Sequence, residues 1–233
     1  MIALAPNALF VGRQPLLHRL EAMYRKGKLI LLVGPSGAGK TMLVAKLSKT
    51  CPIFYAPSCR CLGDFLDALE PQARLERGDL NLAPRVHRLA ASLPKFGWTL
   101  VIDNVVRVPP KVAHLVRALM GTMPVWLIGR SSLPQDYGHV WPYLFAFKRI
   151  DLKPFSFNET RAFLAAAPFA GDRAELLAAS LRLHRLSAGH PAMLAAIVDE
   201  LHRRTYDIKT MEGLHVLALH ARITRVEAQL ANA

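Results

Sequence analysis

The sequence predicts an α/β fold: a five-stranded parallel sheet between helices, followed by a small all-helical lid. Short apolar runs of strand length alternate with amphipathic helical patterns as far as Pro154, and beyond it only helical patterns remain. Of the 233 residues, 52% are hydrophobic and 20% are charged, which is enough apolar material for one sizeable core and a smaller one. We therefore expect a core domain over residues 1–154 and a helical lid over residues 155–233.

The core domain is predicted to alternate helices and strands. Its first strand is a continuous apolar run over residues 28–33, as is typical of a strand buried on both faces of a parallel sheet. The other four strands are expected over residues 53–56, 98–102, 125–128 and 145–152. Helices are expected over residues 13–25, 40–48, 62–69, 85–93 and 111–120. Strand–helix alternation of this kind implies right-handed crossovers between parallel strands.

The lid is predicted to hold helices over residues 158–166, 172–187, 192–204 and 212–230. The stop signal Gly189-His190-Pro191 ends the second of these helices. Pro191 then stands at the start of the next helix, where its missing N–H costs nothing. His190 is more simply a helix-boundary residue than a catalyst.

A Gly-rich turn after the first strand carries the clearest chemical signal. It comprises Gly34, Pro35, Ser36, Gly37, Ala38, Gly39, Lys40 and Thr41, and it matches the phosphate-loop pattern GxxxxGK[ST] in full. Such a loop points backbone N–H groups at phosphate oxygens, and the helix that follows, beginning with Lys40, Thr41 and Met42, adds its N-terminal partial charge. Lys40 is expected to bind the β- and γ-phosphates and Thr41 to ligate Mg²⁺. The sequence therefore predicts a site for ATP and Mg²⁺.

A second signal follows the third expected strand. Asp103 comes directly after an apolar run, at the strand end where ligands bind in open α/β sheets. We expect its carboxylate to hold Mg²⁺ together with Thr41, as a Walker B aspartate does. Asn104 stands next, where many ATPases of this kind carry a glutamate that polarises water. Since an amide cannot accept a proton, hydrolysis should be slow or helped by another group.

The chain resembles the nucleotide-binding domains of AAA+ and STAND ATPases over residues 9–205. The resemblance is carried by the phosphate loop, by Phe10-Val11-Gly12-Arg13, by Arg130 and by the segment around Pro191. It implies that Val11, Gly12 and Arg13 lie beside the adenine, that Arg130 senses the γ-phosphate, and that Pro191 packs on the nucleotide. Phe10 and Val11 could instead be ordinary core residues, and Arg130 could cap the sheet or pair with an acid. Two departures are Asn104 and the lack of a recognisable lid arginine.

Charge points to a polyanionic partner. The chain has 30 Lys and Arg against 17 Asp and Glu, a net charge of +13. The excess lies mainly in residues 1–63 and 105–170. DNA is the expected partner, held through its backbone without sequence preference. The alternative is that the excess reflects a generally basic proteome or ordinary solubility charge. The candidates for one shared binding face are Arg25, Lys26, Lys28, Lys46, Lys49, Arg107, Lys111 and Arg117.

Three functions fit these features to different degrees. We favour an AAA+ ATPase that forms homo-oligomeric rings or filaments on DNA, similar to transposition regulators and helicase loaders. The alternative is a STAND-type nucleotide switch that acts through protein partners in signalling or defence. A small-molecule kinase fits less well, because its lid would be rich in arginine over a second pocket. We expect a cytoplasmic protein without a membrane segment. The sequence has no apolar run of about 20 residues and no secretory signal, and its three cysteines, an odd number, are expected to be free thiols.

Overall fold

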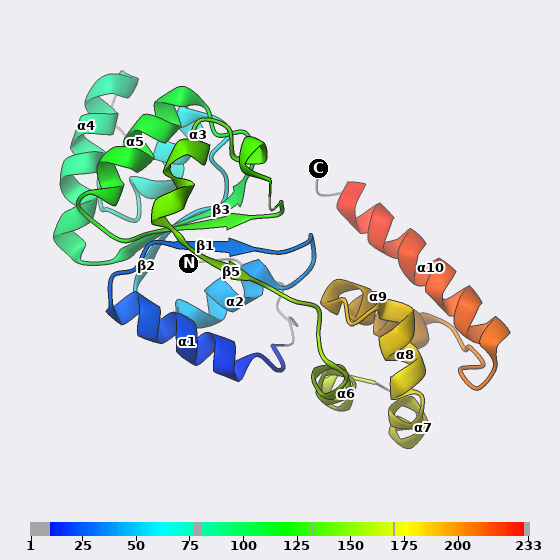
Figure 1. Ribbon diagram of the computed structural model, residues 1–233. Helices are drawn as coiled ribbons and strands as arrows, with labels where there is room; N and C mark the ends of the chain where they lie inside the picture. Colours follow the sequence, from blue (N-terminus) through cyan, green and yellow to red (C-terminus); the bar gives the residue numbers. More distant parts are fainter. Residues whose placement is uncertain (1–9, 77–80, 132, 170, 231–233) are drawn as a thin grey trace. The chain divides into compact units, whose positions relative to one another are not determined.

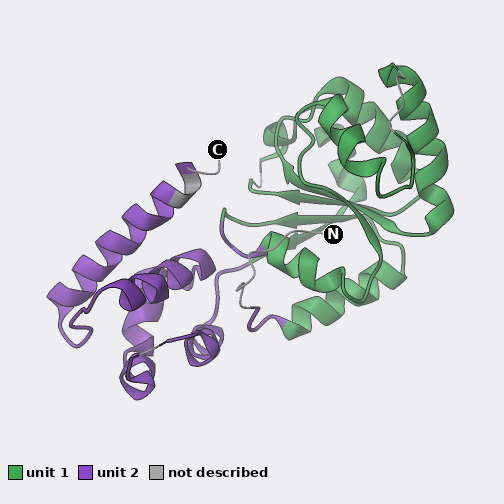
Figure 2. Ribbon diagram, turned by 180° about the vertical axis from the view of Figure 1, so that it is seen from behind, with its two compact units in different colours: residues 1–5, 14–36, 40–152 green, residues 6–13, 37–39, 153–233 purple. Residues whose placement is uncertain are grey.

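The computed structural model describes residues 10–76, 81–131, 133–169 and 171–230. These residues form two compact units (Figure 2). Of the described residues, those between 14 and 36 and between 40 and 152 belong to unit 1, and those between 10 and 13, 37 and 39, and 153 and 230 belong to unit 2. The tip of the phosphate loop, residues 37–39, is thus grouped with the helical part of the chain.

Unit 1 is a parallel sheet of five strands with helices on both faces (Figure 1). Its strands are β1 (Ile30–Val33), β2 (Ile53–Ala56), β3 (Thr99–Val105), β4 (Val125–Gly129) and β5 (Lys148–Asp151), in the order β2-β3-β4-β1-β5. Its helices are α1 (Gln14–Arg25), α2 (Lys40–Leu47), α3 (Leu62–Leu69), α4 (Leu82–Ser92) and α5 (Pro110–Met120), with short 3₁₀ turns η1 (Leu93–Phe96), η2 (Pro134–Tyr137) and η3 (Trp141–Ala146). Helices α1 and α2 cover one face of the sheet, and α3, α4 and α5 cover the other.

Burial of the central strands β1 and β4 fixes the register in which they pair. In β1 and β4 every side chain is buried, and Ile30 pairs with Trp126 while Val33 pairs with Gly129. The indole N–H of Trp126 donates to the carbonyl of Lys28 at 3.0 Å, which satisfies the one polar atom of that buried ring. The α/β sheet predicted from the sequence is therefore confirmed.

Two strand boundaries differ clearly from the sequence prediction. Strand β3 continues past its apolar run to Val105, since a shift in register against β4 between Ile102 and Val105 lets the polar residues join the sheet. The last strand begins only at Lys148, because residues 141–146 form the 3₁₀ turn η3, which has Pro142 in its first turn and in which Phe145 is 89% exposed. Smaller differences of one to three residues affect other element ends.

Unit 2 contains five helices among its described residues. They are α6 (Phe157–Ala166), α7 (Arg173–Ala178), α8 (Ser180–Ser187), α9 (Pro191–Arg203) and α10 (Met211–Leu230). The single helix expected over residues 172–187 is wrong: it breaks between α7 and α8 at Ala179, where ψ is −3°. Alanine has a high helix propensity, so the sequence carries no signal for this break. Helix α6 begins with a capping box formed by Ser156 and Glu159.

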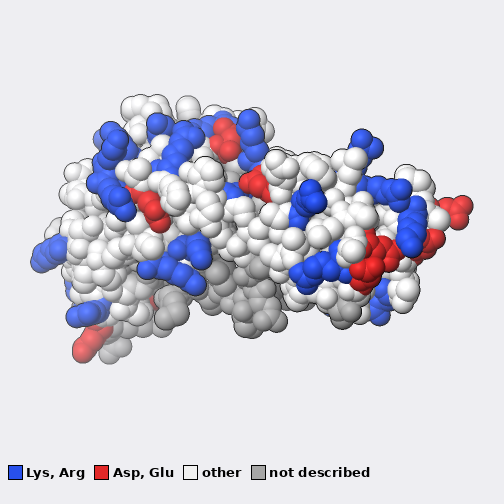
Figure 3. All heavy atoms as spheres, turned by 90° about the horizontal axis from the view of Figure 1, so that it is seen from below, with Lys and Arg blue, Asp and Glu red and all other residues white. Residues whose placement is uncertain are grey.

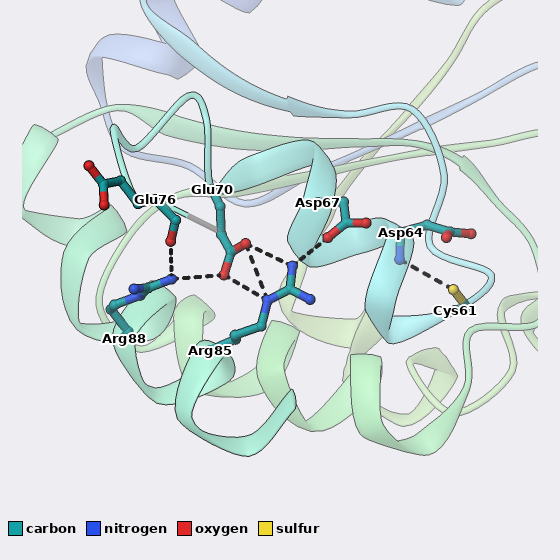
Figure 4. A network of polar contacts seen from close by, with 7 residues as sticks. All are labelled: Cys61, Asp64, Asp67, Glu70, Glu76, Arg85 and Arg88. Atoms are coloured by element: carbon teal, nitrogen blue, oxygen red, sulfur yellow. Dashed lines mark hydrogen bonds and ion pairs between the residues drawn. The ribbon is translucent and has the colours of Figure 1, made fainter. Parts of the chain in front are cut away.

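A buried ion-pair network ties α3 to α4 in unit 1 (Figure 4). The Arg85 guanidinium donates to both oxygens of Glu70, at 3.0 and 2.7 Å, and also to Asp67. The Glu70 side chain is only 1% exposed, and Arg88 adds a longer contact to it at 3.4 Å. These hydrogen bonds from Arg85 lower the pKa of Glu70 despite its burial.

Candidate functional site

The phosphate loop joins β1 to α2, and two of its glycines have positive φ. Gly37 has φ +77° and Gly39 has φ +88°, values that L side chains rarely adopt. Gly37 is also tightly packed: an added Cβ would lie 2.6 Å from Cβ of Ala192 and 2.8 Å from Cε1 of His190. The Gly37 carbonyl accepts a hydrogen bond of 3.2 Å from the Ala192 backbone N–H. Within unit 2, the loop tip is therefore held against the first turn of α9.

Lys40 turns its side chain into the loop. Its Nζ donates to the carbonyls of Gly34 at 2.6 Å and Pro35 at 2.8 Å, and the residue is 8% exposed. Burial lowers the pKa of Lys40 to about 8, with the Asp103 carboxylate opposing that shift and the Arg130 charge adding to it. The ammonium is thus desolvated, which strengthens any contact with a phosphate.

Asp103 accepts hydrogen bonds at both of its oxygens. Oδ2 accepts from the Thr41 hydroxyl at 2.7 Å and from the Tyr55 phenol at 2.9 Å, while Oδ1 accepts from the Asn104 backbone N–H at 2.7 Å. Asp103 is 1% exposed. The structure therefore brings together the two residues that the sequence nominated for Mg²⁺, one from α2 and one from β3.

The donor set suits magnesium. A threonine hydroxyl and an aspartate carboxylate are hard oxygen ligands, and Mg²⁺ binds through one or two carboxylates with phosphates and waters filling its remaining positions. The Thr41 and Asp103 oxygens already face each other across 2.7 Å. These residues fit a Mg²⁺–ATP site.

Tyr55 is a contact that sequence reasoning missed. It lies on β2, next to β3 in the sheet, where Tyr55 pairs with Val101. Burial is the main cause that raises the pKa of Tyr55, and the nearby Asp103 carboxylate raises it further. The phenol therefore remains a hydrogen-bond donor. An aromatic residue in a short apolar strand gives no sign in the sequence that it reaches an aspartate 48 positions away.

Asn104 and Arg130 lie together at the carboxyl ends of β3 and β4. Asn104 has φ +50° and donates through Nδ2 to the carbonyl of Pro57 at 3.2 Å. Its side-chain oxygen accepts from Arg130 Nη2 at 3.3 Å. Asn104 and Arg130 are both exposed. The Asn104 amide is therefore held in place by two partners, and Arg130 contacts it rather than an acid.

The residues expected beside the adenine are packed within unit 2. Arg13, with φ +60°, donates to the carbonyls of Ala38 at 2.9 Å and Lys153 at 2.8 Å. Its guanidinium lies 4.9 Å from the Phe155 ring centroid, and burial lowers its pKa. Arg13 thus clamps the loop tip to the start of the helical segment.

The neighbours of Arg13 lie in the same setting. Val11 packs against the hydrophobic core of unit 2. Gly12 has φ +72°, and a Cβ there would come within 3.1 Å of Glu159 Cγ. Pro191 begins α9 at its first position, and Met42 is half-buried in the first turn of α2. Of the remaining loop residues, Ala38 is buried, Ser36 is half-buried and Pro35 is exposed.

A lid arginine near the loop was also missed by the sequence. Arg225, on α10, places Nη2 3.7 Å from the position that a Cβ on Gly37 would occupy. The two residues are almost 190 positions apart in the sequence. Its position in the fold alone identifies it.

The basic residues do not form the single face expected. Chain direction places Arg25, Lys26, Lys28, Lys46, Lys49 and Arg117 near the amino ends of the strands, whereas Arg107 and Lys111 follow the carboxyl end of β3. The two groups therefore lie at opposite ends of the parallel strands. Lys148 joins the first group, since β5 begins beside Ile30. Figure 3 shows one face, on which blue Lys and Arg side chains are more abundant than red acidic ones.

No protein-family model and no curated protein matches this sequence significantly. Solved structures do match the fold. The Walker-type ATPase of Pyrococcus abyssi matches with TM-score 0.61 and 14% identity, over 96% of this chain and 75% of that one. A STAND protein with a tetratricopeptide repeat sensor from Pyrococcus horikoshii matches with TM-score 0.55 and 19% identity, over 91% of this chain and 33% of that one. Aeropyrum pernix ORC1, solved in complex with DNA, matches with TM-score 0.56 and 16% identity, over 91% and 65%.

These neighbours are AAA+ or related P-loop ATPases, so the resemblance inferred from the motifs is confirmed at the level of the fold. The chain shares the fold of these neighbours: a five-stranded parallel sheet flanked by helices, followed by a helical part. It spans a third of the STAND protein and about two thirds of ORC1. Among the residues that the structure describes, no helix has both the length and the apolar character needed to cross a bilayer.

Proposed function

We propose that this protein binds ATP with Mg²⁺ at residues 34–41. The observation that carries this proposal is the hydrogen bond between Thr41 and Asp103 beside a loop whose lysine is buried. Lys40 would exchange its two loop carbonyls for the β- and γ-phosphate oxygens, and Thr41 and Asp103 would hold Mg²⁺, which supplies charge neutralisation at the phosphates. Arg225 would add a positive charge near the loop tip.

Hydrolysis is proposed to be slow. Asn104 occupies the place next to Asp103 where a carboxylate would accept a proton from water, and its amide is bonded to Arg130 and Pro57 instead. An amide can orient a water molecule but cannot act as a general base. A slow ATPase of this kind works as a switch in which bound ATP persists.

The polyanion that this switch acts on is proposed to be DNA, with nucleotide-dependent homo-oligomerisation into rings or filaments. The basic residues near the amino ends of the strands support contacts with the DNA phosphate backbone that do not depend on base sequence. A fold shared with ORC1, which was solved in complex with DNA, is compatible with this role. A role like that of a transposition regulator or helicase loader would follow.

A STAND-type switch acting on protein partners is the second candidate. The hydrogen bond from Arg130 to Asn104 favours it, since it links the end of β4 to the residue beside the expected metal and so could report the nucleotide state. The two candidates differ in what they require: only the first requires DNA.

Fluorescence anisotropy with a labelled duplex, at several salt concentrations and with or without ATP, tests the proposal. If four to six phosphates are contacted, log K should fall with log salt with a slope of roughly −4 to −5, and ATP should raise affinity. Titration with a fluorescent ATP analogue tests the nucleotide site separately. Lys40→Ala should reduce the binding free energy of the nucleotide by on the order of 2–4 kcal/mol. ATP binding without DNA binding would favour the STAND-type switch, and no loss of affinity in Lys40→Ala would remove the nucleotide assignment.

A further inference from the structure

Helix α10 has two apolar faces on opposite sides. One face, formed by Leu214, Leu217, Ala218 and Ala221, is buried in the core of unit 2, where α10 packs on α9. The other carries Val216, Leu219, Ile223, Val226 and Leu230, which are between 46% and 72% exposed. We call these five residues the outer stripe. Figures 1 and 2 show α10 along the outer side of unit 2, with α8 and α9 on one side of it only.

The outer stripe has the spacing of a coiled-coil seam. Its members follow one another at intervals of three, four, three and four residues, as the a and d positions of a heptad do. A helix that faced only water on this side would not need such a repeat, because single exposed apolar residues are scattered rather than periodic. The stripe therefore fits another helix.

The residue types indicate what kind of helix it fits. With Val216 at position a, Leu219 falls at d and Ile223 at the next a; the second heptad then has the reverse types, with Val226 at d and Leu230 at a. The first heptad therefore carries the argument. A β-branched residue at a with leucine at d favours a parallel pair of two strands. Because the inner face of α10 is already folded against α9, pairing does not have to bear the cost of forming the helix.

The charges beside the stripe match a second copy of the same helix. In this register Arg222 is at position g and Glu227 at the following e, and both are exposed. In a parallel pair, residue g of one helix approaches the next residue e of the other, so Arg222 of each copy meets Glu227 of its partner. A two-fold axis makes both contacts attractive.

We propose that two copies of this chain associate through the outer stripe of α10 as a short parallel coiled coil. The contact does not require ATP or DNA, so it is separate from the proposed nucleotide-dependent assembly. Two heptads make a small interface, so the dissociation constant should be on the order of 1–100 µM. A dimer of this kind would bring two ATPase units together before either binds nucleotide.

The test is the mass of the full chain in solution without nucleotide, measured by light scattering and sedimentation over about 1–200 µM. The wild type should pass from monomer to dimer across that range. Ile223→Glu should raise the dissociation constant by at least tenfold, because two carboxylates would face each other in the seam. Leu181→Glu, at a 46% exposed leucine of α8 outside the stripe, is the matched control and should leave dimerisation unchanged. Lys40→Ala should dimerise as the wild type does, even if it fails to bind ATP.

Charge reversal identifies the partner and its direction. Arg222→Glu and Glu227→Arg should each weaken dimerisation by about tenfold, since each replaces two attractive contacts with two repulsive ones. The double variant should restore it, and an equimolar mixture of the two single variants should associate more tightly than either alone. Thermal unfolding of each variant shows whether the monomer is intact. A monomer at every concentration, or a double variant as weak as the singles, would overturn the proposal and leave the stripe to another protein or to an antiparallel contact.

Discussion

The Tyr55 phenol donates a hydrogen bond of 2.9 Å to Asp103 Oδ2, the same oxygen that accepts from Thr41. A residue of β2 thereby orients the carboxylate of β3 that is proposed to hold Mg²⁺. Tyr55 itself need not touch metal or nucleotide. It acts as a positioning residue.

Tyr55→Phe should raise the Mg²⁺ concentration needed for half-maximal ATP binding by about 3–10-fold. The reason is that residues orienting a metal ligand typically contribute a factor of about ten or more to affinity. Binding measured at several Mg²⁺ concentrations, and again in excess EDTA, separates a metal effect from a loss of the fold. Tyr24→Phe is the control, because Tyr24 donates at 2.8 Å to the carbonyl of Pro52. Equal Mg²⁺ dependence in the wild type and Tyr55→Phe would refute this role.

ATP affinity should fall as pH rises above about 8. Burial lowers the pKa of Lys40 to about 8, so at higher pH the free protein has lost the ammonium that the phosphates require. Bound phosphates raise that pKa, and binding must then take up a proton; affinity should decrease by up to about tenfold per pH unit between pH 8 and 9.5. Titration calorimetry in buffers of different ionisation enthalpy measures the proton uptake. Lys40→Arg should bind more weakly and show no such slope, while a flat profile in the wild type would contradict the expectation.

Asn104→Glu should speed ATP turnover. General-base help contributes about 10²–10⁴-fold where a carboxylate is correctly placed, and the Asn104 side chain already lies at the carboxyl end of β3. Steady-state phosphate release compares the two proteins, with Asn104→Gln as the control of equal length that still lacks a base. A wild-type turnover above the enzyme median of about 10 s⁻¹, without any partner, would show that the protein does not depend on a residue at this position.

Arg225→Ala should weaken ATP binding about 5–30-fold and ADP binding less. Its guanidinium is near the tip of the loop at Gly37, where a cation would be drawn to the outermost phosphates. Competition titrations with ATP and ADP give the ratio. Arg161→Ala, at an exposed arginine of α6, is the matched control. An unchanged ATP-to-ADP preference in Arg225→Ala would assign this arginine a purely structural role.

Arg85→Met should lower the free energy of unfolding by about 3–5 kcal/mol, because the buried Glu70 carboxylate loses its bidentate partner and keeps the longer contact to Arg88. The double variant Arg85→Met, Glu70→Leu should recover much of that loss. Denaturant unfolding measures both. The exposed pair of Arg149 and Asp151, at 2.7 Å, provides the comparison, and Arg149→Ala should cost less than 1 kcal/mol by the usual worth of about 0–1 kcal/mol. Similar losses at the two pairs would contradict the role of burial.

The pH dependence of this network has a definite sign. Because Arg85 lowers the pKa of Glu70 below its unfolded value, the pair stabilises the fold above the ordinary glutamate range. That stabilisation is lost as pH falls through the lowered pKa. The double variant lacks the Glu70 carboxylate and so cannot lose this stabilisation. Its free energy of unfolding should therefore fall less between neutral and acid pH than that of the wild type.

The sequence by itself determined the features that depend on local order along the chain. Apolar runs of strand length predicted the parallel sheet, the phosphate loop could be identified because its glycines and lysine are contiguous, and Asp103 could be placed because the apolar run before it is short. Only the tertiary structure decided which distant residues meet. The hydrogen bonds of Tyr55 with Asp103 and of Arg13 with the loop tip, and the approach of Arg225 to Gly37, join positions far apart in sequence, and no periodicity encodes them. The same holds for the eight basic residues. The sequence gives their charge, but the direction of the parallel strands places them at two opposite ends of the strands. Helix α10 shows the division most plainly, because its repeat of apolar residues predicts a helix, whereas only packing against α9 decides which of its two apolar faces remains exposed.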